Sequence, residues 1–569
     1  MFQNLSPEEI VRREALDKLR EKGIDPFPAA QYHTTETAEQ CLSNYEEGRV
    51  VSIAGRIMNI RDMGKAVFAH IQDHTGKVQA YLNIDSICPG EDKSYFKEVI
   101  KHLVHFGDFV GIEGKLFTTR MGEISVHAEK FTLLAKSVKP LPVVKTDKDG
   151  QVHDAFTDPE LRYRMRYVDL VVNDQVKQTF VMRTRILNAM RQFFNDRGYL
   201  EVDTPVLQAI PGGANARPFI THHNALDVPM YLRIANELYL KRLIVGGFEG
   251  VYEFSRNFRN EGMDRTHNPE FTVMEIYVAY KDYLWMMDFT EKMIQHVCKE
   301  ALGTMQVQFG DATIDFSQPF RRISMTEAIL EFTGFDITGK SESELRTFAH
   351  SIGIEVNDSM GKGKLIDEIF GAKCEGQFIQ PTFITDYPVE MSPLCKRHRH
   401  NPELTERFEL MINGKEVANA YSELNDPIDQ RQRFEDQLKL QERGDDEAMF
   451  IDQDFLRALE YGMPPTSGMG IGIDRLVMFL TNNSTIQEVL FFPQMRPEKF
   501  DTGPDTEAFL SLGIPDMWVE HVIKAGYDSI EKLKSSKPTS IHQTLNGYRK
   551  KNKLEVEAIQ LDQITQWLA

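Results

Sequence analysis

Two segments of the sequence combine charged and aromatic side chains at spacings that suit binding of a charged small molecule. Residues 251–258 and 270–280 have the composition of β-strands, and a polar loop joins them. Because side chains alternate along a strand, Phe271, Glu275 and Tyr277 point to the same side of the second strand. An aromatic ring, a carboxylate and a phenol therefore share one face of a predicted antiparallel pair.

The first of these strands leads into Arg259 and Glu261. A guanidinium can clamp a phosphate through paired hydrogen bonds, and a carboxylate can accept a hydrogen bond from an amine. An ordinary surface hairpin with solvated charges would fit the same pattern. Taken alone, the segment indicates either an anion-binding site or an exposed hairpin.

A second predicted hairpin brings two more carboxylates together. Asn413-Gly414 is the preferred pair for a type I′ turn between two strands. With regular pairing from this turn, Glu409 lies opposite Ala418 and diagonal to Glu416, within about 8 Å. Two like charges at that separation predict a cation, and carboxylate oxygens suit Mg²⁺. Two glutamates splayed into water are the alternative.

Two polar residues, Asn419 and Glu423, follow on the same strand. Simple alternation puts both on the opposite face from Glu416. A β-bulge would be needed to join these side chains in one site, and bulges are common beside active sites.

A third segment, residues 468–479, is rich in glycine and then helical, with Arg475 at the start of the helix. Its spacing is not that of a P-loop or of a dinucleotide-binding fingerprint. By itself the segment is consistent with a strand that packs closely on a helix.

The elements that would position these residues predict an α+β multidomain protein of two to four domains. Short alternating runs at 50–134, broken by glycines, predict a small β module such as an oligonucleotide-binding (OB) barrel. A helical period at 176–197 ends at Gly198, and the body that follows lacks regular strand-helix alternation. The expected parts are an N-terminal helix and OB-fold domain at 1–145, a linker at 146–175, an antiparallel-sheet core at 176–497 with a helical insertion around 330–385, a second linker at 501–504, and a small helical unit at 505–569.

Composition restricts the class of protein. The net charge of -19 argues against a surface coated in basic residues, so any contact with RNA must be local. No apolar run approaches the roughly 20 residues that span a bilayer, and nothing resembles a signal peptide. The five cysteines have no paired spacing, which fits a reducing cytoplasm. Cys395 with His398 and His400 fits a basic loop better than a metal site.

Together the three segments resemble the signature motifs of the class II aminoacyl-tRNA synthetases, most closely those of the lysine-specific members. The resemblance covers about residues 1–497, and its first motif matches the helix ending at Gly198 with the strand ending at Pro205, which lies at the dimer interface in that family. The other two motifs are matched by Arg259-Asn-Glu261 with His267-Asn-Pro-Glu-Phe271, and by Gly470-Ile-Gly-Ile-Asp474-Arg475.

The resemblance implies ATP-dependent ligation of L-lysine to tRNA(Lys) through a lysyl-adenylate, with Mg²⁺, in a cytoplasmic homodimer. Arg259 would hold the α-phosphate and the lysine carboxylate, while Phe271 and Arg475 would cover the two faces of adenine. Arg259 and Arg475 are the implied catalytic residues, and Glu409 and Glu416 the implied Mg²⁺ ligands. The implied ATP-binding residues are Arg259, Glu261, His267, Asn268, Phe271, Glu409 and Arg475.

The same resemblance implies a lysine pocket rich in carboxylates. Tyr277 and Glu423 would hold the ε-ammonium, whereas a related enzyme for aspartate would need cationic residues there. One departure is visible, because Ala418 and Ala420 stand where some relatives carry glycine. The implied lysine-binding residues are Gly213, Glu237, Arg259, Glu275, Tyr277, Asn419 and Glu423.

The β module resembles the anticodon-binding domain of the same family. The implied contacts to the anticodon are Arg61, Phe68, Gln79 and Glu123, and the alternative for Phe68 is a plain core position. Segments near 510 and 525 resemble the C-terminal domain of the RNA polymerase α subunit. The basic run 549–553 there could contact nucleic acid, and a docking role fits as well.

Two other functions stay open at this point. A catalytically silent RNA-binding or regulatory protein would keep the barrel and lose catalytic groups, yet every group that the family motifs require is present. A paralogue that attaches lysine to a protein would lack the β module that this chain has.

Overall fold

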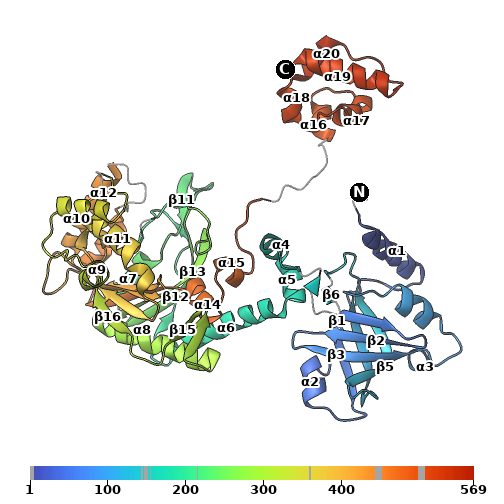
Figure 1. Cartoon of the computed structure of the whole chain (residues 1–569), viewed down its shortest axis with the longest axis horizontal. Coiled ribbons are helices and arrows are strands. Elements are labelled where there is room, and N and C mark those ends of the chain that lie inside the picture. The colour runs from blue at the N-terminus through green and yellow to red at the C-terminus, as the bar shows by residue number, and fades with distance from the viewer. Residues whose placement is uncertain are drawn as a thin grey trace. The chain divides into compact units, whose positions relative to one another are not determined.

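The computed structural model of the chain describes residues 5–142, 145–146, 152–153, 156–214, 216–357, 360–442, 451–497 and 506–568. Its contacts divide the chain into two units, Met1–Gln494 and Met495–Ala569, and we describe each by itself (Figure 1). The predicted linker at 501–504 lies outside the described residues, as does part of the linker predicted at 146–175.

The first unit begins with the predicted N-terminal helix. In α1 (Pro7–Glu21), Ser6 is the N-cap and forms a capping box with Glu9. The segment that follows is a closed barrel with the strand order β1-β2-β3-β5-β4, filled by the alternate apolar residues of each strand. This confirms the predicted OB-type barrel. Its strands are β1 (Val50–Asp62), β2 (Ala66–Gln72), β3 (Lys77–Asn83), β4 (Phe109–Thr118) and β5 (Ile124–Ala135).

The core of the first unit is a large sheet, with the strand order β16-β17-β18-β19-β20-β13-β12-β8 among the described residues. Neighbouring strands are antiparallel except at the two ends, where β16 pairs with β17 and β12 with β8 in parallel. The predicted antiparallel core is therefore confirmed. The strands are β8 (Leu200–Glu201), β12 (Gly250–Phe258), β13 (Glu270–Ala279), β16 (Arg321–Ser324), β17 (Thr382–Thr385), β18 (Arg407–Ile412), β19 (Lys415–Ser422) and β20 (Thr466–Gly472).

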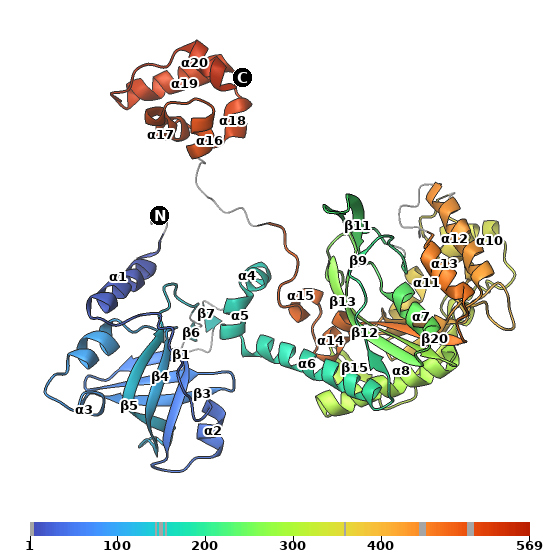
Figure 2. The ribbon, with the colours of Figure 1, turned by 180° about the vertical axis from the view of Figure 1, so that it is seen from behind.

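Helices cover one face of this sheet. α6 (Asp174–Asn195) and α8 (Tyr283–Val297) lie along that face in both views (Figures 1 and 2). Met274 and Ile276 of β13 are fully buried in the same apolar cluster as side chains of α6 and α8. Since neighbouring residues of a strand point to opposite faces, residues 273, 275 and 277 must face away from these helices.

Other elements of the first unit complete the core. The residues that lie between β16 and β17 in the sequence form α9, α10 and α11, and side chains of these helices make up a separate apolar cluster. The remaining strands are β6 (Lys145–Thr146), β7 (Val152–His153), β9 (Leu207–Gln208), β10 (Ile220–His223), β11 (Val228–Leu232), β14 (Gln306–Phe309) and β15 (Ala312–Asp315). The remaining helices are α2 (Ala38–Ser43), α3 (Ile84–Ile87), η1 (Tyr95–Ile100), α4 (Pro159–Arg164), α5 (Arg166–Val172), α7 (Glu237–Val245), η2 (Cys298–Leu302), α9 (Met325–Thr333), α10 (Glu342–Ser351), α11 (Lys362–Lys373), η3 (Glu375–Gln377), η4 (Val389–Met391), α12 (Pro427–Glu442), α13 (Gln453–Glu460), α14 (Ile473–Leu480) and α15 (Ile486–Val489).

The second unit is helical and has an apolar core of its own. Phe509, Trp518, Leu533, Ile541 and Trp567 are buried within that core. Its helices are α16 (Thr506–Ser511), α17 (Asp516–Lys524), α18 (Ile530–Lys534), α19 (Pro538–Lys551) and α20 (Leu561–Leu568).

Two further features concern the whole chain. Within the described ranges, no helix combines the length and the apolar character that crossing a membrane requires. All five cysteines are buried free thiols: Cys41, Cys88, Cys298, Cys374 and Cys395.

Candidate active site

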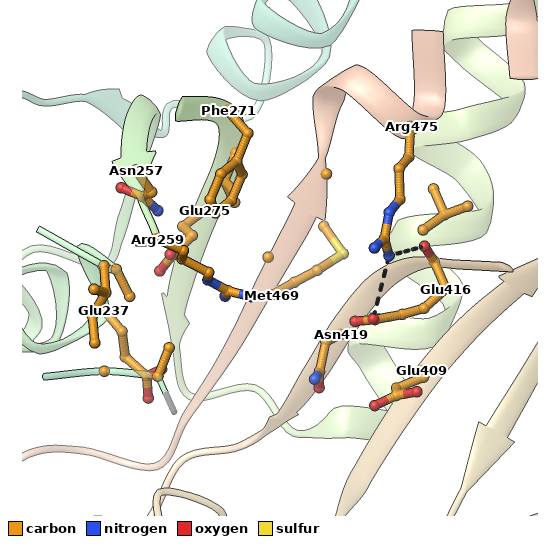
Figure 3. Close-up of a pocket in the computed structure, with 18 of the residues that line it drawn as sticks. Glu237, Asn257, Arg259, Phe271, Glu275, Glu409, Glu416, Asn419, Met469 and Arg475 are labelled. Atoms are coloured by element: carbon orange, nitrogen blue, oxygen red, sulfur yellow. Dashed lines mark hydrogen bonds and ion pairs between the residues drawn. The ribbon is translucent and has the colours of Figure 1, made fainter. Parts of the chain in front are cut away.

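The face of the sheet opposite α8 carries a cavity of about 510 Å³. Side chains reach it from the middle strands β12, β13, β18, β19 and β20, from the start of α7, and from the start of α14 (Figure 3). The strand parity predicted from the sequence is confirmed, because Phe271, Val273, Glu275 and Tyr277 all line this cavity.

The hairpin β18–β19 corrects one predicted pairing. Asn413 and Gly414 have φ angles of 50° and 67°, as a type I′ turn requires. Beyond the turn the register shifts at an extra residue, Val417, so that Glu409 pairs with Asn419. The predicted pairing of Glu409 with Ala418 was wrong because it assumed regular alternation. The bulge was the feature needed to bring Glu416 and Asn419 to one face, and both line the cavity.

One end of the cavity presents cations and an aromatic ring. The guanidinium of Arg259 lies 5.2 Å from the centre of the Phe271 ring, and its Nε is buried without a hydrogen-bond partner among the described residues. Arg475 donates from Nη1 to the backbone oxygen of Glu416 at 3.0 Å (Figure 3). Its Nη2 lies 3.1 Å from Nε2 of His267. Glu261 also lines this end.

The buried carboxylate of Asp474 fixes the strand that carries Phe271 relative to the helix that carries Arg475. Asp474 accepts a hydrogen bond from the backbone nitrogen of Thr272 at 2.8 Å, and it pairs with Arg183 of α6 at 2.7 Å. Because Asp474 precedes Arg475 directly, this contact holds the start of α14 against β13.

Arg407 is a cavity residue that the sequence analysis missed. It donates to Oε1 of Glu409 at 2.6 Å and to Oδ1 of Asn419 at 3.1 Å, and its guanidinium lies 4.4 Å from the centre of the Tyr387 ring. Since Oδ1 of Asn419 accepts this bond, the amide NH₂ of Asn419 is free to donate into the cavity. Arg407 lies two residues before Glu409 on one strand, so parity would have placed it on this face.

Glu409 and Glu416 form the candidate metal site. Burial and the nearby charge of Glu416 raise the pKa of Glu409 to about 7, although Arg407 opposes the rise. A divalent cation would relieve this repulsion, and the donor set of two carboxylates suits Mg²⁺. No group of three or more His, Cys, Asp or Glu side chains in the described parts of the chain could enclose a metal. The protein would therefore supply part of the coordination shell and leave the remaining positions to other oxygens.

The opposite end of the cavity is acidic. Glu237 and Glu275 are only 5% and 7% exposed, and two tyrosines accompany them. Tyr421 donates to Oε1 of Glu237 at 2.7 Å, and Tyr277 donates to Oε2 of Glu275 at 3.0 Å. Burial, reinforced by the charge of Glu237, raises the pKa of Glu275 to about 8. Gly213 closes this end with a left-handed backbone, φ 87°, beside Glu237.

Glu423 lies behind the cavity wall. Its carboxylate is 1% exposed and forms an ion pair with Lys241 of α7. A Cβ at Gly468 would lie 2.2 Å from Oε1 of Glu423 and 2.3 Å from the ring of Tyr277. Only a residue without a side chain therefore fits beside these two groups. Every other residue predicted to bind ATP, lysine or metal lines the cavity itself.

Comparison with known proteins agrees with this geometry. A family model described as class II tRNA synthetases (D, K and N) matches residues 158–496, and an OB-fold nucleic acid binding domain model matches residues 51–134. A lysine--tRNA ligase of Porphyromonas gingivalis is 62% identical over 99% of this chain and 98% of its own length. The chain belongs to the class II lysyl-tRNA synthetases.

Two more relatives of this synthetase carry the same name and match less of the chain. The protein of Christiangramia forsetii is 66% identical over 88% of each chain. The protein of Azobacteroides pseudotrichonymphae is 62% identical over 87% of this chain and 100% of its own length. About an eighth of the synthetase described here thus has no counterpart in that relative.

The barrel of the synthetase brings its predicted anticodon residues to neighbouring strands. Arg61 pairs with Phe68 between β1 and β2, and Phe68 is half-buried rather than part of the core. Gln79 donates to Oε2 of Glu123 at 2.7 Å. Three further rings that the sequence analysis missed form a cluster with Phe68 at centroid distances of 5.0 to 5.8 Å: Tyr81, Phe117 and His127.

Proposed function

We propose that this protein ligates L-lysine to tRNA(Lys) through a lysyl-adenylate, with release of AMP and pyrophosphate. The observation that carries the proposal is the division of one cavity into an acidic end and a cationic, aromatic end. Glu237, Glu275 and Tyr277 suit the ammonium groups of lysine, since a buried ammonium requires carboxylate partners. At the cationic end, Arg259 has a buried Nε with no hydrogen-bond partner among the described residues, and a bound anion would satisfy this donor.

In the first step, an oxygen of the lysine carboxylate attacks the α-phosphorus of ATP in line. The bond from that phosphorus to the bridging oxygen breaks, and pyrophosphate leaves with the electron pair. Arg259 binds the carboxylate and the α-phosphate together, which aligns the reacting atoms and neutralises the charge that develops. The amide NH₂ of Asn419 helps to orient the carboxylate.

The adenine and the distal phosphates lie at the cationic end in this proposal. Phe271 stacks on one face of adenine, and Glu261 accepts a hydrogen bond from its amine. Arg475 covers the other face and extends to the γ-phosphate, with His267 beside it. Arg475 would then exchange its contact with Glu416 for the nucleotide.

Mg²⁺ would bind Glu409 and Glu416 and would supply charge neutralisation at the phosphates of ATP. Arg407 holds Glu409 and Asn419 in place for these roles. The fit rests on the two carboxylates that line the same cavity, and a bound cation would lower the raised pKa of Glu409 again.

In the second step, a ribose hydroxyl of the terminal adenosine of the tRNA attacks the acyl carbon, and AMP leaves. The 3′-hydroxyl is the one expected from the class. We propose that the barrel at 1–145 binds the anticodon through Arg61, Phe68, Gln79 and Glu123, with Tyr81 as a further stacking platform.

We further propose that the protein works in the cytoplasm as a homodimer. Apolar side chains along residues 200–210 support an interface with a second copy, because four of them are 38–47% exposed: Leu200, Val206, Leu207 and Ile210. Light scattering that gives the mass of one chain at micromolar concentration would contradict the dimer.

Pyrophosphate exchange into ATP, run with each of the twenty amino acids in turn, tests the function. We expect exchange with lysine alone, because Tyr277 and the carboxylate of Glu423 behind it disfavour a side chain without a positive charge. Exchange driven by aspartate or asparagine and not by lysine would overturn the substrate.

A further inference from the structure

Beside the acidic end of the cavity, the protein carries an ammonium group of its own. Lys241 lies one helical turn after Glu237 on α7, so their side chains stack. Nζ of Lys241 is 2.5 Å from Oε1 of Glu237 and also pairs with Glu423 of the segment after β19. The Lys241 side chain is fully buried, as is that of Glu423.

The surroundings of Lys241 give it no other charged partner among the described residues. The rings of Tyr421 and Phe455 lie 5.6 and 5.8 Å from Nζ, and the rest of its cluster is apolar. Burial acts to lower the pKa of Lys241, but the carboxylates of Glu237 and Glu423 together raise it. The ammonium therefore stays charged and depends on these two carboxylates.

A count of charges relates this cluster to the substrate. The acidic end and the region behind it hold three carboxylates, those of Glu237, Glu275 and Glu423, and one ammonium, that of Lys241. When all four groups are ionised, the excess of two negative charges equals the two ammonium groups of lysine. Without Lys241 the excess would be three, and no ligand group would balance the third negative charge at the fully buried Glu423.

We propose that Lys241 is a positioning residue for lysine recognition, which fixes the carboxylates of Glu237 and Glu423 and leaves this end of the site with the charge that a diamino acid neutralises. This inference rests on lysine being the substrate. Lys241 acts through Glu237, which faces the cavity, and through Glu423, which lies directly behind Gly468 and Tyr277.

Two neighbours help to hold the carboxylate partners of Lys241 in place. Tyr421 donates to the same oxygen of Glu237 that Lys241 binds, so this oxygen has two donors and the other oxygen of Glu237 remains for the ligand. Glu423 is held from its backbone as well, because its nitrogen donates to the oxygen of Thr466 at 2.8 Å. Loss of Lys241 would leave Glu237 with one donor and Glu423 unpaired.

Substitution of Lys241 by Met tests the proposal, because Met keeps the volume and removes the charge. In pyrophosphate exchange, we expect the KM for lysine to rise by about 100-fold, the effect of removing one partner of a buried charge pair. The KM for ATP should stay within about twofold, since Lys241 does not reach the nucleotide end. A lysine KM equal to that of the wild type would overturn the role.

Lys136 offers a matched control. It is also a fully buried lysine with one carboxylate partner, Asp108, and it belongs to the barrel. K136M should lower the thermal midpoint of unfolding and leave the lysine KM unchanged, because exchange does not involve tRNA. If K136M raised the lysine KM as much as K241M, the effect would come from general destabilisation and the proposal would fail.

Chemical rescue separates charge from volume and does not depend on how K241M folds. The variant K241A lacks three carbons and the ammonium, which n-propylammonium can supply. We expect added propylammonium to lower the lysine KM of K241A at least about tenfold, while neutral 1-propanol of the same size has no effect. Equal rescue by both compounds would show that Lys241 only fills space, and rescue by neither would count against a role of its ammonium.

The wild type and K241M together distinguish the proposed function from the role of Lys241. If the wild type showed no exchange with lysine, the proposed function would be wrong. If the wild type exchanged with lysine and K241M matched it, only the role of Lys241 would be wrong.

Discussion

Glu275 is the residue at which burial and recognition conflict. An empty acidic site cannot keep neighbouring carboxylates ionised at low cost, and the pKa of Glu275 rises to about 8 because of burial and the charge of Glu237. Near neutral pH the empty site therefore holds a proton that a bound ammonium of lysine must displace.

This conflict predicts a pH dependence of lysine binding. The bound ammonium lowers the pKa of Glu275, so binding releases a proton and the affinity rises as the pH rises toward 8. We expect the lysine KM in the exchange reaction to fall by up to about tenfold per pH unit between pH 6.5 and 7.5. In E275Q the KM should be higher and this dependence should vanish; an unchanged slope in E275Q would exclude Glu275 as its source.

Arg407 holds two cavity groups at once, one proposed to bind metal and one proposed to bind the substrate carboxylate. Replacing it by Met leaves Glu409 without its fixed cation and releases the amide of Asn419. We expect R407M to lower kcat/KM for lysine in exchange by about 100-fold. The half-exposed pair of Arg321 with Glu331 provides the control, since R321M should change kcat/KM by less than about twofold.

At the scale of single elements, strand β20 carries glycines next to the cavity. Gly468 lies against Tyr277 and Glu423, whereas Gly470 has its nearest neighbour, Cγ of Glu275, at 3.7 Å from an added Cβ. The two glycines share one face of one strand and differ in what an added methyl group would meet.

We therefore expect G468A to raise the lysine KM at least about tenfold and to lower stability by about 1–3 kcal/mol, the usual cost of overpacking. G470A should change the lysine KM by less than about twofold and the stability by less than about 0.5 kcal/mol, since its Cβ meets only ordinary contacts. Exchange kinetics and thermal unfolding of the pair measure the difference. Equal behaviour of the two variants would contradict the close packing at Gly468.

The elements also show what a sequence can predict about such a site. Parity along β13 placed Phe271, Glu275 and Tyr277 correctly, because a strand without bulges alternates strictly. On β19 the same rule failed at Val417, since a bulge depends on how the strand pairs with its neighbours. The burial of Lys241 was not predicted, because its partner Glu423 is distant in sequence and a lysine on a helix is usually solvated.

At the scale of the whole molecule, the chain consists of a large unit with the candidate site and a small helical unit with a separate core. A relative that is matched over its whole length has no counterpart for about an eighth of this chain. We expect a truncation after residue 497 to keep kcat and KM for lysine-dependent exchange within about twofold, because all cavity residues precede it.

The truncated protein should also retain the main thermal transition, which calorimetry would record. Loss of exchange in a protein that is still folded would show that the second unit supports catalysis. Charging of tRNA by the same truncation separately reports any contribution of the helical unit to the second step.

The burial of all five thiols has a practical consequence for following how the protein opens. Burial raises the pKa of Cys41 to about 11 and those of Cys298, Cys374 and Cys395 to about 12, so almost no thiolate exists near neutral pH. Cys41 belongs to the barrel, Cys298 to the core beneath the sheet, and Cys374 to the cluster between β16 and β17. An alkylating reagent would thus label each of these cysteines only when the part of the fold around it unfolds. The order of labelling would reveal the order in which the barrel, the core and the cluster unfold.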